Sequence, residues 1–264
     1  MATSFLENKF FIPFERPIKA QELPARFTYP FEYEPHPLCL LASKELQNYI
    51  INQKEWKHNF GLIKGSTGAI IGKMFGVLVV KTKQDEIGYL AAFSGKLAGS
   101  YNHSRFVPPI FDSLTKDSFL NVGMNELSRI NQEISMLEES NNADNKEKIS
   151  FLQQLRKNNS IALQDKLFDH YHFLNQDGEE KNLREIFKTT LNTKPPSGAG
   201  DCAAPKLLQY AFQNQMIPIA IAEFWWGLSP KSEFWKHGHF YPACREKCEP
   251  ILSHMLKGIE LDKK

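Results

Sequence analysis

The sequence has few cysteines, little net charge and no long hydrophobic run, and each shortage excludes a class of protein. Four cysteines in 264 residues are too few for the disulfide framework of a small secreted domain. A formal net charge of +2 means that any RNA-binding surface would have to be a local patch. No stretch approaches the ~18 consecutive apolar residues typical of a membrane-spanning helix, and MATSFLENKFFIPFERP lacks the basic and apolar regions of a signal peptide. We therefore expect a cytoplasmic protein without a membrane span.

The first half of the chain predicts an extended arm followed by an α/β core. Residues 1–37 carry many aromatic side chains and six prolines, a spacing that prevents a long helix and favours an arm laid over the domain. Residues 38–59 have apolar residues on one helical face. Residues 74–97 form two apolar runs around Gln84-Asp85, which predicts a β-hairpin covered on both faces. Cys39, at the start of the predicted helix, is interpreted as a buried structural thiol.

Three of the four cysteines lie between residues 198 and 258, the segment around which the rest of the chain is organised. Cys202 precedes a helical pattern, residues 217–224 (IPIAIAEF) form a buried strand, and Cys244 and Cys248 open a second helix. A right-handed crossover brings both helix starts to the same edge of a sheet. We therefore expect the three thiols to lie close together.

Such a group of thiols predicts a metal site, with zinc as the metal. Cys202, Cys244 and Cys248 would be three ligands, and His239 or water would be the fourth. Cysteines at helix starts have a lowered pKa and favour the thiolate, which is the form that binds zinc. The alternative is that the three thiols are only buried where two helices meet the sheet, and the sequence favours neither interpretation.

The order of these residues matches the zinc deaminases in part. Those enzymes have a Cys or His ligand, a Glu two residues later, and a Pro-Cys-x-x-Cys pair on the next helix. Here CAAPK has Ala204 where the glutamate belongs, and the second motif, which runs from Pro242 to Cys248, is longer than the template. Glu223 could replace the missing glutamate or could form a buried salt bridge. The fold class predicted from this pattern is α/β, with a deaminase-like three-layer core.

Residues 123–175 change character and predict a helical hairpin. Apolar residues recur at three- and four-residue spacing from Leu127 to Leu137, the pattern breaks at 141–145, and it resumes at Ile149. The predicted organisation is therefore an arm at 1–37, a core at 38–112 and 191–264, and an inserted antiparallel helical hairpin at 113–190. The hairpin is either an exposed scaffold or a contact arm for RNA or a protein.

Aromatic and basic residues near the second cysteine pair form a candidate RNA surface. Exposed aromatic rings can stack on bases, and Lys and Arg side chains can neutralise phosphates. The candidates are Trp225, Trp226, Trp235, Lys236, Arg245 and Lys247. The alternative for each tryptophan is a place in the core or at its rim.

Several long stretches resemble the N-terminal region of the long, two-part RluA-type RNA pseudouridine synthases. They are EPHPLCLLASKELQNYI at 34–50, GKMFGVLVV at 72–80, GYLAAFSGKLAG at 88–99, FVPPIFD at 106–112, PSGAGDCAAPKLLQYAF at 196–212, AEFWWG at 222–227 and HGHFYPACREKCEPILSHML at 237–256. The resemblance covers most of the chain and implies a role in RNA modification. Catalysis in that family rests on an aspartate in an Arg-Leu-Asp context, which this sequence lacks. No catalytic residue is therefore carried over, and the resemblance implies a separate pseudouridine synthase catalytic chain as a partner.

The function predicted from these observations is a non-catalytic, RNA-associated module related to the front half of a pseudouridine synthase. One alternative is a zinc-dependent hydrolase of the deaminase type, with Glu223 or another displaced carboxylate as the general acid/base. Another is a protein-interaction scaffold that recruits its partner through the hairpin. Whether the chain is an enzyme is left open by the sequence.

Overall fold

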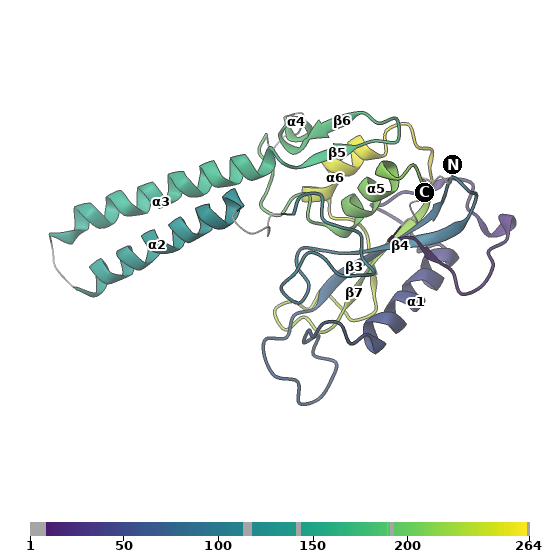
Figure 1. Cartoon of the computed structure of the whole chain (residues 1–264), viewed down its shortest axis with the longest axis horizontal. Coiled ribbons are helices and arrows are strands. Elements are labelled where there is room, and N and C mark those ends of the chain that lie inside the picture. The colour runs from purple at the N-terminus through teal and green to yellow at the C-terminus, as the bar shows by residue number, and fades with distance from the viewer. Residues whose placement is uncertain (1–8, 113–117, 141–143, 189, 191–192, 263–264) are drawn as a thin grey trace, which may run out of the picture. The chain divides into compact units, whose positions relative to one another are not determined.

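The computed structural model describes residues 9–112, 118–140, 144–188, 190 and 193–262 (Figure 1). In chain order the elements are β1 (Ile12–Pro13), the 3₁₀ helix η1 (Ala20–Glu22), β2 (Phe27–Thr28), α1 (Pro37–Asn52), β3 (Lys73–Lys81), β4 (Ile87–Phe93), α2 (Phe119–Glu139), α3 (Asn145–Phe168), β5 (His172–Leu174), β6 (Glu180–Asn182), α4 (Leu183–Phe187), α5 (Ala203–Gln213), β7 (Ile217–Trp226), β8 (Phe240–Tyr241), α6 (Arg245–Met255) and β9 (Leu261–Asp262). The chain divides into two compact units, Met1–Ile110 with His172–Lys264, and Phe111–Tyr171. Among the described residues, no helix combines the length and the apolar character needed to cross a bilayer.

A five-stranded antiparallel sheet forms the centre of the first unit. Its order is β1-β4-β3-β7-β8, and β3 pairs antiparallel with both β4 and β7. The strands β4 and β7 therefore run in the same direction on either side of β3. The chain reaches β7 from β4 by way of α5, so α5 crosses over β3. The predicted hairpin and the strand predicted at 217–224 are both confirmed.

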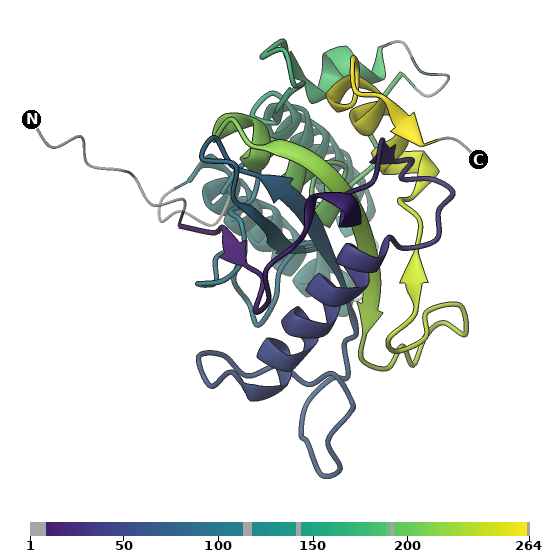
Figure 2. The ribbon, with the colours of Figure 1, turned by 90° about the vertical axis from the view of Figure 1, so that its right-hand side faces the viewer.

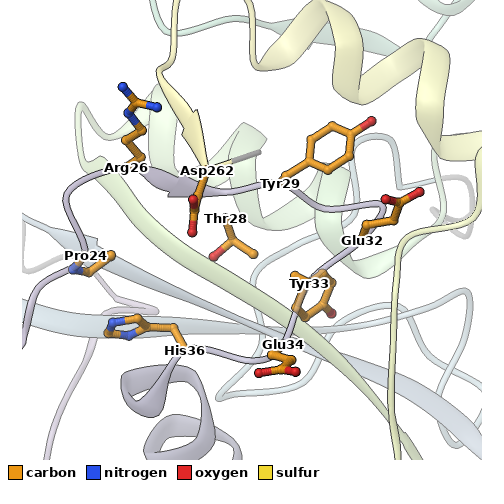
Figure 3. Close-up of a pocket in the computed structure, with 9 residues that line it drawn as sticks. All are labelled: Pro24, Arg26, Thr28, Tyr29, Glu32, Tyr33, Glu34, His36 and Asp262. Atoms are coloured by element: carbon orange, nitrogen blue, oxygen red, sulfur yellow. The ribbon is translucent and has the colours of Figure 1, made fainter. Parts of the chain in front are cut away.

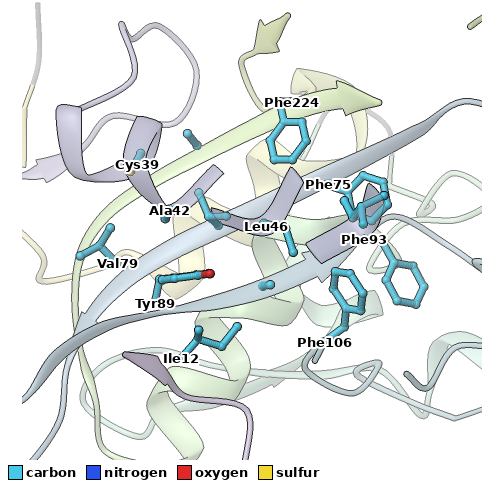
Figure 4. Close-up of a cluster of buried hydrophobic side chains, with 14 of the residues drawn as sticks. Ile12, Cys39, Ala42, Leu46, Phe75, Val79, Tyr89, Phe93, Phe106 and Phe224 are labelled. Carbon is cyan, nitrogen blue, oxygen red and sulfur yellow. The ribbon is translucent and has the colours of Figure 1, made fainter. Parts of the chain in front are cut away.

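Helix α1 covers one face of this sheet. Pro37 stands at its first position, and the side chain of His36 accepts a hydrogen bond from the backbone N–H of Leu38, so the helix begins where the proline-rich arm ends. Its buried residues recur every four positions and pack on alternate residues of the strands, as Figure 4 shows. This core contains Leu38, Cys39, Ala42, Leu46, Phe75, Val77, Val79, Tyr89, Ala91, Phe93, Ala222 and Phe224. Cys39 is fully buried, as predicted for a structural thiol.

Helix α5 lies on the opposite face, next to α6 (Figure 1). Gly76 of β3 permits its close approach, because a Cβ at this position would lie 3.0 Å from the Cβ of Ala203 and 3.1 Å from Leu207 Cδ1. Both faces of the central strands are thus covered, which explains why these strands are almost continuously apolar. The contact between Gly76 and Ala203 also places the start of α5 directly over β3.

The arm before α1 contacts β4 and β7, the strands on either side of β3 (Figure 2). Strand β1 pairs with β4, and side chains further along the arm bond to β7. Thr28 Oγ1 accepts a hydrogen bond from the N–H of Ile221 at 3.3 Å, and the Tyr33 hydroxyl accepts one from the N–H of Glu223 at 2.9 Å. The same hydroxyl donates to the carbonyl of Tyr241 in β8. A small pocket beside these contacts is lined by residues of the arm and by Asp262, as seen in Figure 3.

Two long helices, α2 and α3, make up most of the second unit. They pack on each other through Ile130, Ile134 and Leu152, and Glu133 forms an ion pair with Lys148 at 3.1 Å. Most of the break predicted at 141–145 lies outside the described residues. The unit ends at Tyr171, earlier than the predicted boundary at 190.

The residues after Tyr171 belong to the first unit because their side chains are buried there. Phe173 of β5 is fully buried, and its carbonyl lies 2.9 Å from Nε2 of the buried His254 in α6. The helix α4 also packs against α6. The amphipathic sequence pattern of β6 and α4 indicates a buried face, but it does not show which of the two units buries that face.

Candidate metal centre

The thiols of Cys202, Cys244 and Cys248 form one cluster, in which all three sulfur atoms lie within 4.8 Å of one another. The Sγ atoms of Cys244 and Cys248 are 3.4 Å apart. The crossover connection predicted this gathering, and the structure confirms it. Three cysteine side chains in this arrangement could hold a metal ion.

Two helix starts bring these side chains together. Cys202 is the N-cap residue of α5 and Cys244 is the N-cap residue of α6, both with extended backbone angles. Cys248 follows one turn after Cys244 and therefore lies on the same side of α6. The sequence predicted a lowered pKa for the cysteines at both helix starts, but the pKa is lowered at Cys244 and raised at Cys202 and Cys248.

The pKa values of the three thiols are shifted in different directions. Hydrogen bonding with Cys202 and Cys248 lowers the pKa of Cys244 to about 2, and the backbone N–H groups of Lys247 and Cys248 lower it further. Hydrogen bonding to Cys244 and burial raise the pKa of Cys202, and hydrogen bonds to Cys202 and Cys244 raise the pKa of Cys248. A bound cation would favour the deprotonated form of all three thiols.

The spacing of the sulfur atoms fits zinc. Tetrahedral ligands at the usual Zn–S distance of about 2.3 Å lie roughly 3.8 Å from one another. The 3.4 Å separation of Cys244 and Cys248 is close to that value, and no pair in the cluster is further apart than 4.8 Å. Three thiolates are also a donor set that zinc prefers over the hard cations.

Glu223 of β7 places a carboxylate beside this cluster. Its side chain is only 6% exposed, and Oε1 accepts a hydrogen bond from the backbone N–H of Ala204 at 3.3 Å. Burial raises the pKa of Glu223 to about 7, and the negative charge of Cys244 adds to this effect. The carboxylate is not one of the grouped ligand atoms. It is therefore a group close to the centre that can gain or lose a proton near neutral pH.

The structure does not bring His239 into the cluster. Its side chain is exposed, and its backbone holds the loop before β8, with the carbonyl accepting from the N–H of Trp225. His237 packs on Trp226 and accepts a hydrogen bond from the N–H of Gly227. Among the described residues, the grouped ligand atoms are the three sulfurs alone. A fourth ligand position would therefore be open to water or substrate.

The predicted RNA-binding residues lie in different environments. Trp225 and Trp235 stack at 5.1 Å between ring centroids, both partly exposed, whereas Trp226 is 6% exposed and belongs to the core under α1. Lys236 is exposed. Arg245 forms ion pairs with Glu32 and Glu249, and Lys247 is partly buried at the first turn of α6. Trp226 is thus a core residue, and the other five reach the surface.

A buried lysine beside the cluster was missed by the sequence analysis. The ammonium group of Lys206 donates to the carbonyls of Phe93 at 3.0 Å and Gly95 at 3.4 Å, and the side chain is 2% exposed. Burial lowers its pKa to about 8, while Asp201 and Cys202 act in the opposite direction. The sequence does indicate that Lys206 lies near the cluster, because it follows Cys202 by four residues and so shares its side of the helix.

No family model matches the chain, and no curated protein or solved structure matches it significantly. The function therefore has to be inferred from the site itself.

Proposed function

We propose that the cysteine cluster binds zinc and that the protein is a zinc-dependent hydrolase of the deaminase type. The observation that carries this proposal is the position of Glu223. The deaminase template has a glutamate two residues after its first ligand, where this chain has Ala204. The carboxylate of Glu223 bonds to the backbone of that same residue from the neighbouring strand. Glu223 would therefore supply a carboxylate near the position of the template glutamate.

The arrangement of the core supports a deaminase-like fold. Two antiparallel strands are followed by a ligand-bearing helix, a strand that joins the sheet on the far side of the first one, and a second ligand-bearing helix. Both helix starts meet at one edge of the sheet, where Cys202 follows the Asp201 carbonyl that accepts from the N–H of Gly95. We propose that α2 and α3 are a helical hairpin inserted into this core.

Deamination replaces an amino group of a base by an oxygen atom from water and releases ammonia. A zinc ion with an open position would polarise that water. Glu223 would take a proton from the water and deliver it to the departing amine, so that each turnover returns the carboxylate to its starting state. Burial raises the pKa of the Glu223 carboxyl, which favours a group that both accepts and returns a proton. The backbone N–H of Ala204 would orient the carboxylate.

The loops around this edge favour a negatively charged substrate. The register pairs Lys73 with Trp226 and Phe75 with Phe93, so the start of β3 and the ends of β4 and β7 lie together. The loops that leave these three ends are residues 53–72, 94–110 and 227–239. They contain seven Lys or Arg residues and only two acidic residues, in a chain whose formal net charge is +2. An RNA base presented on a phosphate backbone would fit this edge.

The same basic edge supports the second candidate, a non-catalytic RNA-associated module. In that case the zinc would be structural, and Trp225, Trp235 and Lys236 would contact the RNA without chemistry. The resemblance to the front half of RluA-type pseudouridine synthases favours this candidate. It also favours a separate catalytic chain of that family as the partner.

The test uses chain purified without a metal-affinity tag. Elemental analysis should find about one zinc per chain. The zinc-loaded protein is then incubated with cytidine, adenosine, guanosine, their nucleotides and single-stranded RNA, and the products are analysed by nucleoside mass spectrometry. Conversion of an amino group to an oxygen that depends on Glu223 would support the hydrolase. A zinc-loaded chain that binds RNA and converts none of these probes would contradict it and favour the second candidate.

A further inference from the structure

The four cysteines of the chain are free thiols that differ in their exposure to solvent. Cys39 and Cys248 are buried, at 0% and 1% exposure, whereas Cys202 is partly exposed and Cys244 is exposed. Oxidation of a cysteine depends on how well the oxidant reaches its sulfur atom. An oxidant dissolved in water therefore meets Cys244 first.

Cys248 is the thiol next to Cys244 on the same helix. Their Sγ atoms are 3.4 Å apart, and the backbone N–H of Cys248 donates to the carbonyl of Cys244 at 3.2 Å. A disulfide bond is about 2.05 Å long, so the two sulfur atoms need to approach by roughly 1.4 Å. An exposed thiol with a second thiol in reach is the arrangement of redox-sensing cysteines, in which the second thiol resolves the oxidised form of the first.

The start of α6 allows Cys244 to make this movement. Cys244 is the N-cap residue, with extended backbone angles, and its side chain makes no capping hydrogen bond that the movement would break. Cys202 is held more firmly, because the adjacent Ala203 packs on Gly76 of β3. We therefore expect oxidation to join Cys244 to Cys248 and not to Cys202.

The helix also makes such a bond easy to reverse. Side chains four residues apart on a regular helix have Cβ atoms about 5–6 Å apart, whereas the Cβ atoms of a disulfide are about 3.5–4.5 Å apart. Closing the bond between Cys244 and Cys248 would therefore pull on the first turn of α6. A disulfide under tension is more easily reduced than a relaxed one.

We propose that Cys244 and Cys248 are a peroxide-sensitive thiol pair, which closes to a disulfide and releases the bound metal. The release rests on the zinc site of the proposed function, and the disulfide rests on the geometry of the pair alone. Sulfur atoms in a disulfide no longer carry the negative charge with which thiolates hold zinc, and Cys202 alone supplies too few ligands. Oxidation would thus switch off the metal centre, and reduction would allow zinc to return.

The reaction consumes one molecule of hydrogen peroxide. The thiolate of Cys244 attacks one peroxide oxygen, the O–O bond breaks, and a sulfenic acid forms while hydroxide leaves. The thiolate of Cys248 then attacks Sγ of Cys244, the S–S bond forms, and a second hydroxide leaves. Two protons from solvent convert both hydroxides to water. The sulfur atoms together lose two electrons, which the peroxide gains. In the zinc-loaded chain both thiols are already deprotonated, so the reaction does not depend on their pKa.

The first experiment treats the zinc-loaded, full-length chain with hydrogen peroxide and follows zinc with a chromogenic chelator. About one zinc per chain should be released as the disulfide forms. Trypsin cleaves after Arg245 and Lys247, so mass spectrometry of an unreduced digest should find the peptides of Cys244 and Cys248 linked. Dithiothreitol followed by zinc should restore the loaded chain. Cys39→Ala is the matched control, because it lacks a cysteine outside the cluster and should release zinc as the wild type does.

The second experiment uses Cys248→Ser, which lacks the resolving thiol. It is compared with the wild type after both have been stripped of metal, because the variant also lacks one of the three ligands. Cys244 of the variant should be oxidised to a sulfinic or sulfonic acid that dithiothreitol does not reverse. The metal-free wild type should form the reversible disulfide instead. Circular dichroism checks that both chains are folded.

The thiol pair and the proposed function fail in different ways. A chain that binds no zinc but forms the disulfide between Cys244 and Cys248 contradicts the proposed function and the release of metal, and it supports the thiol pair. A zinc-loaded chain that keeps its metal in excess peroxide overturns the thiol pair and leaves the hydrolase intact. A disulfide that joins Cys202 instead, or irreversible oxidation of Cys244 in the wild type, overturns it as well.

Discussion

Glu223 Oε1 lies 3.3 Å from the backbone nitrogen of Ala204, so a strand residue reaches the first turn of the helix that carries Cys202. Both residues are buried, with Ala204 1% and Glu223 6% exposed, and the contact between them is direct. The contact ties β7 to the start of α5. It also fixes the carboxylate next to the three thiols.

Substitutions at Glu223 and Ala204 test the proposed catalytic role of the carboxylate. Glu223→Gln should keep the zinc and the hydrogen bond to Ala204 but lose hydrolysis by at least ~100-fold, since general acid–base catalysis contributes about that much. The double variant Glu223→Ala/Ala204→Glu should recover part of the activity, because it restores the glutamate of the template. Initial rates on the best substrate from the panel measure both effects.

The control for this series is Glu233→Gln, which changes an exposed glutamate of the loop after β7. It should leave the rate unchanged. If Glu223→Gln is as active as the wild type while it holds the same amount of zinc, Glu223 is not the group that transfers the proton.

Loss of a thiol should remove the metal and weaken the fold together. Cys244→Ser removes the thiolate with the lowest pKa in the cluster, so zinc content should fall well below one per chain and the midpoint of thermal unfolding should drop. Elemental analysis and calorimetry check this expectation. Cys39→Ala is the control: it alters a buried cysteine of the α1 core, so stability should fall while zinc content stays the same. Unfolding of the wild type that is unchanged by a chelator would mean that the thiols are only buried.

Much of the core could be predicted because its signals are local. The helix under the arm, the hairpin and the cysteine-bearing helices each follow from hydrophobic periodicity, and the crossover rule gathers the three thiols. The hydrogen bond between Glu223 and Ala204 could not be predicted in the same way. This hydrogen bond depends on how closely α5 approaches β3, and glycine at position 76 permits that approach because it has no side chain. His239 was assigned by its closeness in sequence, but its side chain is exposed on the loop before β8.

RNA binding should depend on the loops at the sheet edge. The variant Lys96→Ala/Lys231→Ala/Lys236→Ala should weaken binding of single-stranded RNA and lower the slope of log K against log salt by about 0.7 for each phosphate contact that is lost. Arg245→Ala should have a smaller effect, because Arg245 already pairs with Glu32 and Glu249. Fluorescence anisotropy at several salt concentrations measures both slopes. Equal slopes for the wild type and the triple variant would place the RNA contact elsewhere.

The buried ammonium of Lys206 should make stability depend on pH in the alkaline range. Burial lowers its pKa from 10.5 to about 8, so between these values the unfolded chain binds a proton that the folded chain has lost. The free energy of unfolding therefore gains a contribution that rises with pH through this window, by at most ~1.4 kcal/mol per pH unit. Lys206→Met should remove this contribution, and Lys83→Met, in the turn after β3, should retain it. Denaturant unfolding of chelator-treated protein gives the slopes, and identical slopes for Lys206→Met and the wild type would refute the assignment.

The chain should form no pseudouridine from unmodified RNA. The Arg-Leu-Asp segment that carries the nucleophilic aspartate in the pseudouridine synthases is missing from this sequence. Incubation of the purified chain with unmodified RNA, followed by nucleoside mass analysis, checks this. Pseudouridine that accumulates in proportion to the amount of this chain would show that another residue supplies the nucleophile.

The hydroxyls of Thr28 and Tyr33 occupy the N–H groups of Ile221 and Glu223 on the outer side of β7. Strand β8 pairs with Glu223 and Phe224, and among the described residues no strand pairs with the first half of β7 on that side. Side chains of the arm thus accept the hydrogen bonds from β7 that the backbone carbonyls of a sixth strand would otherwise accept. Removing it would convert β7 into a template for strand addition, and the shortened chain would be expected to assemble edge to edge into aggregates.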